Sequence, residues 1–140
     1  MTGVPNNEII LEVKDLSVHF TLQGGFFDAS KGTVRAVDGV SFTLHKGSTF
    51  GLVGESGCGK TTTGRLIMNV IRPTSGRILF HDEEKGIVEI NTLPEKKMRP
   101  FRKKIQMVFQ DPYSSLDPRM TIEQIVGEPL RAAGRVVKGV

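Results

Sequence analysis

The stretch Gly54-Glu55-Ser56-Gly57-Cys58-Gly59-Lys60-Thr61 fills the template G-x-x-x-x-G-K-[ST] at every fixed position. Apolar residues 49–53 precede it and predict a strand. Residues 60–71 follow it with an apolar stripe at helical spacing, which predicts a helix. A strand, a glycine-rich loop and a helix in this order form the setting in which the template binds phosphate. The stretch therefore predicts a phosphate-binding loop, or P-loop.

Each residue type in this loop has a use in holding a phosphate chain. Glycine permits positive φ angles and lets an anion approach the backbone without meeting a Cβ, so successive amides can point at the β-phosphate. Lys60 supplies a flexible charge for the β- and γ-phosphates, and the Thr61 hydroxyl can ligate Mg²⁺. A plain connector is the alternative, but a connector has no use for Lys-Thr at its end. The predicted cofactor-binding residues here are Gly54, Glu55, Ser56, Gly57, Cys58, Gly59, Lys60, Thr61 and Thr62.

Length and composition indicate one ordinary globular domain, because the 140 residues are 38% hydrophobic and 24% charged. No run approaches 18 apolar residues, and the N-terminus lacks a basic start and an apolar region, so we expect neither a membrane span nor secretion. The single cysteine, Cys58, suits a reducing compartment. The three histidines, His19, His45 and His81, show no metal-ligand spacing.

The net charge of +4 arises largely from basic residues within 96–104. Phe101 is the one aromatic residue among them, so the stretch lacks the interleaved stacking rings of a single-strand nucleic-acid site. We interpret it as a solvated helix face, with a phosphate-tracking patch as the alternative, and expect no nucleic-acid partner.

Apolar alternation predicts antiparallel strands at 9–20 and 40–44, and a hairpin formed by 77–80 and 87–90. Residues 23–32, rich in glycine and polar side chains, predict a loop or hairpin excursion. These strands surround the strand–loop–helix unit, so the pattern predicts an α/β nucleotide-binding core that carries an antiparallel sheet.

The last third of the chain predicts two helices around one apolar strand. Residues 94–104 form a charged helix that leads into a buried-type strand at 105–109. Thr121, with Gln124 three positions later, opens a second helix as a capping box. Pro129 is expected to kink or end that helix.

Gln110 follows the strand 105–109 directly and precedes Asp111-Pro112-Tyr113-Ser114-Ser115-Leu116-Asp117-Pro118-Arg119-Met120-Thr121. Together with the P-loop, this run resembles the ATP-binding subunits of ABC transporters. More narrowly, it is similar to the subunits of dipeptide, oligopeptide and nickel importers. The narrower match rests on residues 108–130, 34–42 and 54–60, and the resemblance extends from about Ile9 to Arg131.

The resemblance implies a partial P-loop NTPase core with an antiparallel β subdomain and the start of a helical subdomain. All of 1–140 then forms the N-terminal part of one ABC ATPase domain. The implied parts are 9–47 and 77–90 for the β subdomain, 48–76 and 91–110 for the core, and 111–140 for the helical subdomain.

Two residues outside the loop gain roles from the resemblance. Gln110 matches the Q-loop glutamine, which helps to position Mg²⁺ and the attacking water, so with Lys60 it is a predicted catalytic residue and with Thr61 a predicted metal ligand. A Gln that only satisfies backbone groups at a strand end is the alternative. Phe20 matches the aromatic ring that stacks on adenine. Phe26 or Phe27 could take this role instead, and Phe20 could be a core residue.

Some expected features of the family do not occur in these 140 residues. The signature Leu-Ser-Gly-Gly-Gln is absent, as are the switch histidine and the Walker B Asp-Glu pair. Residues 78–83 imitate the Walker B pattern but come too soon after the P-loop helix and predict a hairpin turn. Asp111 after 105–109 is a second imitation, which Gln110 and the proline-rich run argue against. We therefore interpret the chain as an N-terminal piece of such an ATPase.

The function that follows is the ATP-binding, energy-coupling part of a transporter, with peptide import favoured. ATP and Mg²⁺ are the implied cofactors. The implied partners are a second ATP-binding subunit, identical or different, the transmembrane permease subunits and, indirectly, a solute-binding protein. The implied location is the cytoplasmic face of the plasma membrane. A small P-loop kinase or other phosphotransferase, and a remnant that only binds nucleotide, are the alternatives.

Overall fold

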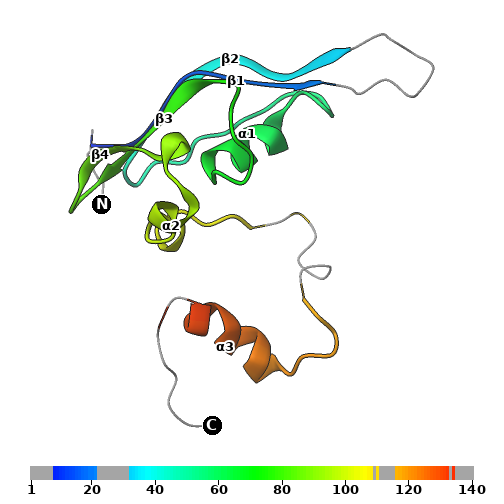
Figure 1. Ribbon diagram of the computed structural model, residues 1–140, viewed down its shortest axis with the longest axis vertical. Coiled ribbons are helices and arrows are strands. Elements are labelled where there is room, and N and C mark those ends of the chain that lie inside the picture. Colours follow the sequence, from blue (N-terminus) through cyan, green and yellow to red (C-terminus); the bar gives the residue numbers. More distant parts are fainter. Residues whose placement is uncertain (1–7, 22–31, 109, 111–115, 133, 135–140) are drawn as a thin grey trace, which may run out of the picture. The chain divides into compact units, whose positions relative to one another are not determined.

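A computed structural model describes residues 8–21, 32–108, 110, 116–132 and 134 of the chain (Figure 1). The chain divides into two compact units, Met1–Met98 and Arg99–Val140, which are described separately. Most of the expected loop at 23–32 lies outside the described residues.

The first unit is built on an antiparallel sheet with the strand order β2-β1-β3-β4 (Figure 1). The alternation of apolar and polar residues explains this sheet, and the predicted strands at 9–20, 77–80 and 87–90 are confirmed. The strand predicted at 40–44 is longer than expected. The observed bounds are β1 Ile9–Thr21, β2 Thr33–His45, β3 Ser75–Asp82 and β4 Gly86–Glu89.

Much of the core of this unit lies on one face of the sheet. Leu11 and Val13 of β1 and Ile78 and Phe80 of β3 are buried there, in keeping with the period of two along each strand, and Leu79 is buried on the opposite face. Helix α1 lies beside this sheet (Figure 1) and its Leu66 is fully buried. Burying one such leucine contributes about 1.5–3 kcal/mol, so apolar contact holds the helix that follows the phosphate loop.

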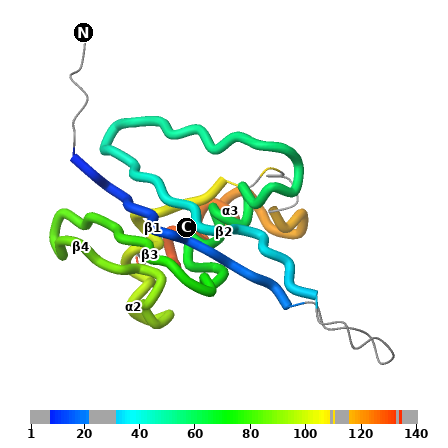
Figure 2. Tube along the Cα trace, turned by 90° about the horizontal axis from the view of Figure 1, so that it is seen from above, coloured from blue at the N-terminus to red at the C-terminus, as the bar shows by residue number. Residues whose placement is uncertain are grey.

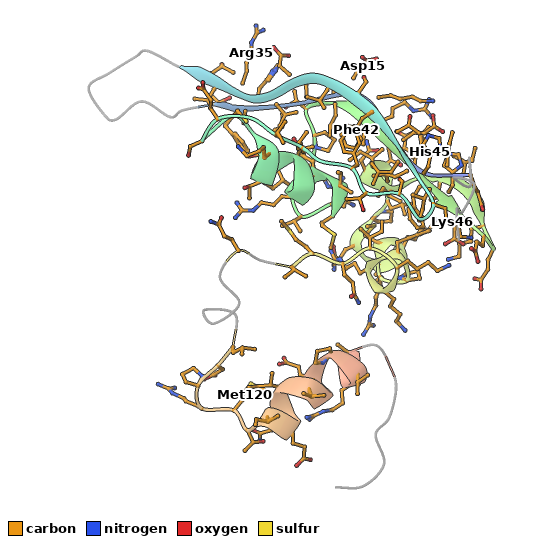
Figure 3. All side chains as sticks on the ribbon, turned by 180° about the vertical axis from the view of Figure 1, so that it is seen from behind. Asp15, Arg35, Phe42, His45, Lys46 and Met120 are labelled. Atoms are coloured by element: carbon orange, nitrogen blue, oxygen red, sulfur yellow. The ribbon has the colours of Figure 1, made fainter. Side chains whose placement is uncertain are left out.

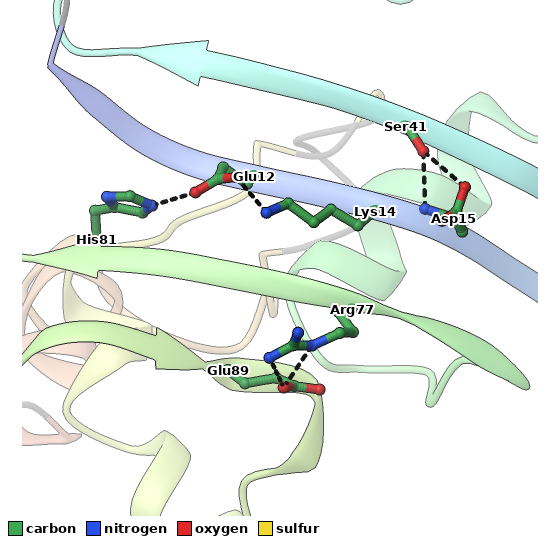
Figure 4. A network of polar contacts seen from close by, with 7 residues as sticks. All are labelled: Glu12, Lys14, Asp15, Ser41, Arg77, His81 and Glu89. Carbon is green, nitrogen blue, oxygen red and sulfur yellow. Dashed lines mark hydrogen bonds and ion pairs between the residues drawn. The ribbon is translucent and has the colours of Figure 1, made fainter.

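The other face of the sheet carries polar pairs within and between strands (Figure 4). Glu12 Oε1 lies 2.7 Å from His81 Nε2 of β3, and Glu12 Oε2 lies 2.7 Å from Lys14 Nζ of the same strand. Arg77 and Glu89 form a second cross-strand pair at 2.8 Å. The hydrogen bonds from Lys14 and then from His81 lower the pKa of Glu12, because they favour its charged form.

A further ion pair joins the turn after β2 to the β3–β4 turn. Lys46 Nζ lies 2.6 Å from Glu83 Oε1 and 3.6 Å from Glu8 Oε2. Both groups raise the pKa of Lys46, the Glu83 hydrogen bond most strongly. Figure 3 labels Lys46 next to His45 at the end of β2.

The β3–β4 turn confirms the hairpin predicted for residues 78–83. Asp82 is buried, and its Oδ1 accepts the amides of Glu84 and Lys85, both at 3.0 Å. The carboxylate thus serves as the acceptor of a tight turn. This role accounts for an Asp-Glu pair at this point without a metal.

Helix α1, Lys60–Ile67, is shorter than the predicted span of 60–71. Asn69 adopts a left-handed conformation with φ of 52°, and its N–H donates to the Leu66 carbonyl at 2.9 Å. The Val70 N–H donates to the Arg65 carbonyl at 3.0 Å. These two bonds form a Schellman motif, which ends the helix at a residue type that tolerates left-handed backbone.

The strand predicted at 49–53 does not form in the described structure. Phe50 stacks on Phe42 of β2, labelled in Figure 3, with ring centroids 4.9 Å apart, but Val53 is 88% exposed. Figure 2 shows the chain leaving β2 in a wide arc before it returns to α1. An apolar segment becomes a strand only beside a strand that satisfies its N–H and C=O groups, and the four described strands pair with one another.

The charged helix predicted at 94–104 is also wrong. Residues Glu95–Met98 form the short helix α2 in the first unit, after the 3-10 turn η1 at Ile90–Thr92. The second unit begins with a separate 3-10 turn, η2, at Phe101–Lys103. Pro100 explains the break, because it lacks an N–H and disfavours helical backbone in the residue before it.

The rest of the second unit contains helix α3, Ile122–Ala132. The predicted capping box is confirmed, since the Thr121 N–H donates to Gln124 Oε1 at 2.9 Å and the Gln124 N–H donates to Thr121 Oγ1 at 3.3 Å. Of the two alternatives expected for Pro129, ending the helix is wrong, because α3 continues through it, and a kink stays a prediction.

Residues 105–108 form no strand, and Phe109 lies outside the described residues. The helices of the described residues are all too short or too polar to cross a bilayer.

Candidate phosphate-binding site

The start of α1 presents backbone amides without side-chain caps. Gly59 is the N-cap residue, with φ of 94°, and no side chain hydrogen-bonds the cap. Its carbonyl accepts the Thr63 N–H at 2.8 Å and the Thr63 hydroxyl at 3.0 Å, and Thr63 is buried. The Thr63 bond is the first of the helix, so the amides of residues 60–62 remain available to an anion at the positive end of α1.

Lys60 folds back over the loop that precedes it. Its Nζ donates to the Gly54 carbonyl at 2.8 Å and to the Glu55 carbonyl at 2.6 Å. A third, weaker contact reaches Cys58 Sγ at 3.4 Å. The ammonium is therefore held in the loop by hydrogen bonds to neutral backbone carbonyls. Phosphate oxygens can replace these carbonyls and form stronger, charge-assisted bonds.

The loop around this lysine is open to solvent on one side. Residues 54–58 and Thr61 are exposed, and Thr62 is half-buried. A Cβ at Gly57, where φ is 83°, would meet no atom within 4 Å, whereas a Cβ at Gly54 would lie 2.6 Å from Cys58 Sγ. The loop thus has an open side for a ligand and a closed side where Cys58 packs against the Gly54 backbone.

Strand β2 supports the loop from behind. A Cβ added at Gly59 would overlap the Ala36 carbonyl oxygen and would lie 3.4 Å from Val37 Cγ2. Sequence reasoning did not predict this contact, because nothing in the local pattern shows which strand approaches Gly59.

Phe20 lies near the end of β1, opposite Val34 of β2. Both side chains are partly exposed, 41% for Phe20 and 45% for Val34. Phe20 shares a strand face with Val18, two residues earlier, and Val18 pairs with Val37, whose Cγ2 would lie 3.4 Å from a Cβ at Gly59. The two exposed apolar groups therefore lie on the sheet face that also meets the phosphate loop. Sequence reasoning missed Val34.

The opposite face of this strand pair is polar. His19 pairs with Arg35, and both ring nitrogen Nε2 of His19, at 3.6 Å, and the Arg35 guanidinium, at 3.2 Å, approach the Asp38 carboxylate. Since these groups are absent from the Phe20 face, that face offers an apolar surface to a flat ring.

Gln110 belongs to the second unit and is exposed. Its predicted role as a metal ligand and catalytic residue stays a prediction, as do the roles of Lys60, Thr61 and Phe20. Among the described residues, no group of three or more His, Cys, Asp or Glu side chains could hold a metal ion. The Thr61 hydroxyl and the Gln110 amide are oxygen donors of the kind that Mg²⁺ accepts beside phosphate ligands.

Comparisons with known proteins agree with this geometry. A family model described as ABC transporter matches residues 37–138. The oligopeptide transport ATP-binding protein AppF of Bacillus subtilis is 50% identical over 125 residues, which cover 89% of this chain and 36% of AppF. The glutathione import ATP-binding protein GsiA of Salmonella typhimurium is 44% identical over 131 residues, covering 94% of this chain and 20% of GsiA. The chain spans about a third of the length of AppF.

The fold is also found among solved structures. A dimeric post-hydrolysis state of the ATP-binding cassette MJ0796, bound to ADP and Pi, superposes with a TM-score of 0.67 at 18% identity, covering 94% of this chain and 50% of that one. The fold class expected from the sequence, a partial P-loop NTPase core with an antiparallel sheet, is confirmed. The division into subdomains stays a prediction.

Proposed function

The chain belongs to the ABC transporter family, and from this membership we propose that it forms the nucleotide-binding part of an ATP-binding subunit that energises peptide import. The observation that carries the proposal is the Lys60 ammonium, held by the Gly54 and Glu55 carbonyls beside uncapped amides at the start of α1. This arrangement concentrates positive potential where a chain of phosphates would lie. The relatives named for oligopeptide and glutathione transport support peptides as the cargo.

Within this proposal, each predicted residue has one task. The loop Gly54–Thr62 surrounds the phosphates, and Lys60 pairs with the β- and γ-phosphate oxygens. Phe20, together with Val34, stacks on the base. ATP supplies the phosphoryl group whose transfer to water releases the free energy for transport.

The residues fit Mg²⁺ as a second cofactor. The Thr61 hydroxyl lies exposed in the first turn of α1, and the Gln110 amide oxygen is a neutral oxygen donor. The Thr61 hydroxyl would hold the ion together with phosphate oxygens, and the ion would neutralise charge on the phosphates. Gln110 is proposed as a further ligand from the sequence resemblance alone. Gln110 would in addition orient the attacking water.

The partners in this proposal are a second ATP-binding subunit and the transmembrane permease subunits, with a solute-binding protein acting through them. A dimeric state of the structurally similar cassette supports the first of these. The corresponding location is peripheral, at the cytoplasmic face of the plasma membrane.

The direct test is a calorimetric titration of the chain with Mg-ATP. We expect weak binding, and Lys60→Ala should weaken it by about 2–3 kcal/mol because a charge-assisted contact to phosphate is lost. Lys96→Ala is the matched control, since Lys96 is an exposed lysine of α2. Equal ATP affinity in wild type and Lys60→Ala would refute the site.

A further inference from the structure

We propose that the β-bulge at Ala36 sets the distance between the phosphate loop and the base-stacking surface, which is formed by Phe20 and Val34. This inference rests on the proposed function. The bulge follows from the register of β1 and β2. Val18 pairs with Val37 and His19 pairs with Arg35, so β1 advances one residue while β2 advances two. Ala36 is the extra residue, and its backbone departs from the regular ladder.

The first side of the argument is the contact between this bulge and the phosphate loop. A Cβ at Gly59 would overlap the Ala36 carbonyl oxygen, which means that the Gly59 backbone lies directly against it. Gly59 is held from the other side by Thr63, whose N–H and hydroxyl both donate to the Gly59 carbonyl. The residue that immediately precedes Lys60 therefore lies against the Ala36 carbonyl of β2 on one side and accepts two hydrogen bonds from Thr63 of α1 on the other.

The second side is the base-stacking surface on the same strand. Val34 pairs with Phe20 and lies two residues before Ala36. Only Arg35 separates Val34 from the bulge, and Arg35 pairs with His19 on the polar face. The apolar surface and the support of the phosphate loop are thus joined by three consecutive residues of one hydrogen-bonded strand.

A ligand that contacts both places must span the interval between them. Because the strand pairing fixes this interval before binding, the ligand does not have to order it, and that preorganisation favours a nucleotide over a bare phosphate chain. The Ala36 residue acts through Gly59 and makes no contact with the reacting atoms, so it is a positioning residue.

The alternative is a purely structural role, because a bulge can simply increase the twist of a strand pair and β1–β2 contains other bulges. Between Ile9↔His45 and Leu11↔Leu44, for example, β1 carries Ile10 as an extra residue. That bulge lies at the far end of the strand pair from Phe20 and Val34. It therefore provides an internal control for the effect of removing a bulge as such.

The test deletes Ala36 in the full 140-residue chain. The deletion restores a regular ladder and keeps the pairs Val18–Val37, His19–Arg35 and Phe20–Val34. Calorimetric titrations with Mg-ATP and with Mg-tripolyphosphate then give the preference for the nucleotide. We expect tripolyphosphate affinity to stay within about twofold of wild type, and the ATP preference to fall by about fivefold or more.

Deletion of Ile10 is the matched control and should leave the ATP preference unchanged. Val37→Ala is the second variant, because it removes both γ-methyl groups, including the Cγ2 that lies next to Gly59, and keeps the backbone length. It should lower the ATP preference by about twofold, and it decides the question if circular dichroism shows that the Ala36 deletion does not fold.

The outcomes separate this inference from the function on which it rests. Wild type that binds neither ATP nor tripolyphosphate would overturn the proposed function, and the positioning role with it. Wild type that binds both, with an unchanged ATP preference in the folded Ala36 deletion or, failing that, in Val37→Ala, would overturn the positioning role alone.

Discussion

Cys58 places a thiol inside the phosphate loop, between the Gly54 backbone and the Lys60 ammonium. The side chain is exposed, so an alkylating reagent can reach it. An adduct there would fill the space that phosphates require, and we expect iodoacetamide to abolish ATP binding while saturating ATP protects the thiol. Mass spectrometry of the labelled chain measures the protection, and calorimetric titration of the labelled chain with ATP measures the loss of binding. Cys58→Ser should bind ATP as wild type does, and labelling at one rate with and without ATP would contradict the site.

The residues of the loop could be predicted from the sequence because the template is local. Eight consecutive residues specify the glycines, the lysine and the helix start, and none of them needs information from elsewhere in the chain. The support of Gly59 by Ala36 could not be predicted, since it depends on a bulge in a strand pair more than twenty residues away in sequence. Val34 was missed for the same reason.

At the scale of elements, α1 depends on the burial of Leu66. Leu66→Ala should lower the free energy of unfolding by about 2–5 kcal/mol, because it leaves a cavity between the helix and the sheet. It should also weaken ATP binding, since the helix carries Lys60 and Thr61. Val70→Ala is the control, with a side chain 68% exposed, and should change stability by less than about 0.5 kcal/mol. Urea titration followed by circular dichroism measures the stability of both variants. Equal urea midpoints for Leu66→Ala and wild type would contradict the packing role.

The polar face of the sheet gives a dependence on pH. Hydrogen bonds from Lys14 and His81 lower the pKa of Glu12 below its ordinary value of 4.5. A lowered carboxyl pKa contributes stability that is present above pH 4.5 and is lost as pH falls through the folded-state value. Glu12→Gln should therefore reduce the acid sensitivity of the thermal midpoint below pH 4.5. Glu84→Gln, at an exposed position of the β3–β4 turn, should retain the wild-type profile. Identical acid profiles for Glu12→Gln and wild type would contradict this role of the pair.

The sequence predicted the elements that alternation and turn chemistry specify locally, such as the β3–β4 hairpin and the capping box of α3. It wrongly predicted strands in two apolar segments, which would need a neighbouring strand to pair with. Residues 49–53 and 105–108 have strand composition, but backbone pairing is a non-local property and the described strands do not supply it. The helix at 94–104 was a different error, because the break at Pro100 could have been recognised from the residue itself.

At the scale of the whole molecule, the proposed function and the content of the chain together predict the catalytic behaviour. Hydrolysis requires a carboxylate that polarises water and donors that stabilise charge on the γ-phosphate, and these 140 residues contain neither a Walker B pair nor a signature motif. We expect no measurable steady-state ATPase activity in a coupled assay.

Exposed apolar residues such as Val53 and Val108 should also make the chain prone to aggregation, which light scattering can follow. Lys60-dependent turnover by a soluble monomer would instead favour a phosphotransferase.

The strand order β2-β1-β3-β4 has a consequence for synthesis on the ribosome. The strand made first, β1, occupies an inner position, and its second neighbour arrives late, since Glu12 and His81 are 69 residues apart. A growing chain can pair β1 with β2 early. The other edge of β1 has no strand to pair with until residues 75–82 have left the exit tunnel. The phosphate loop is made within this interval. Under the proposed function, we therefore expect the chain to become competent to hold a nucleotide only after β3 has closed the sheet.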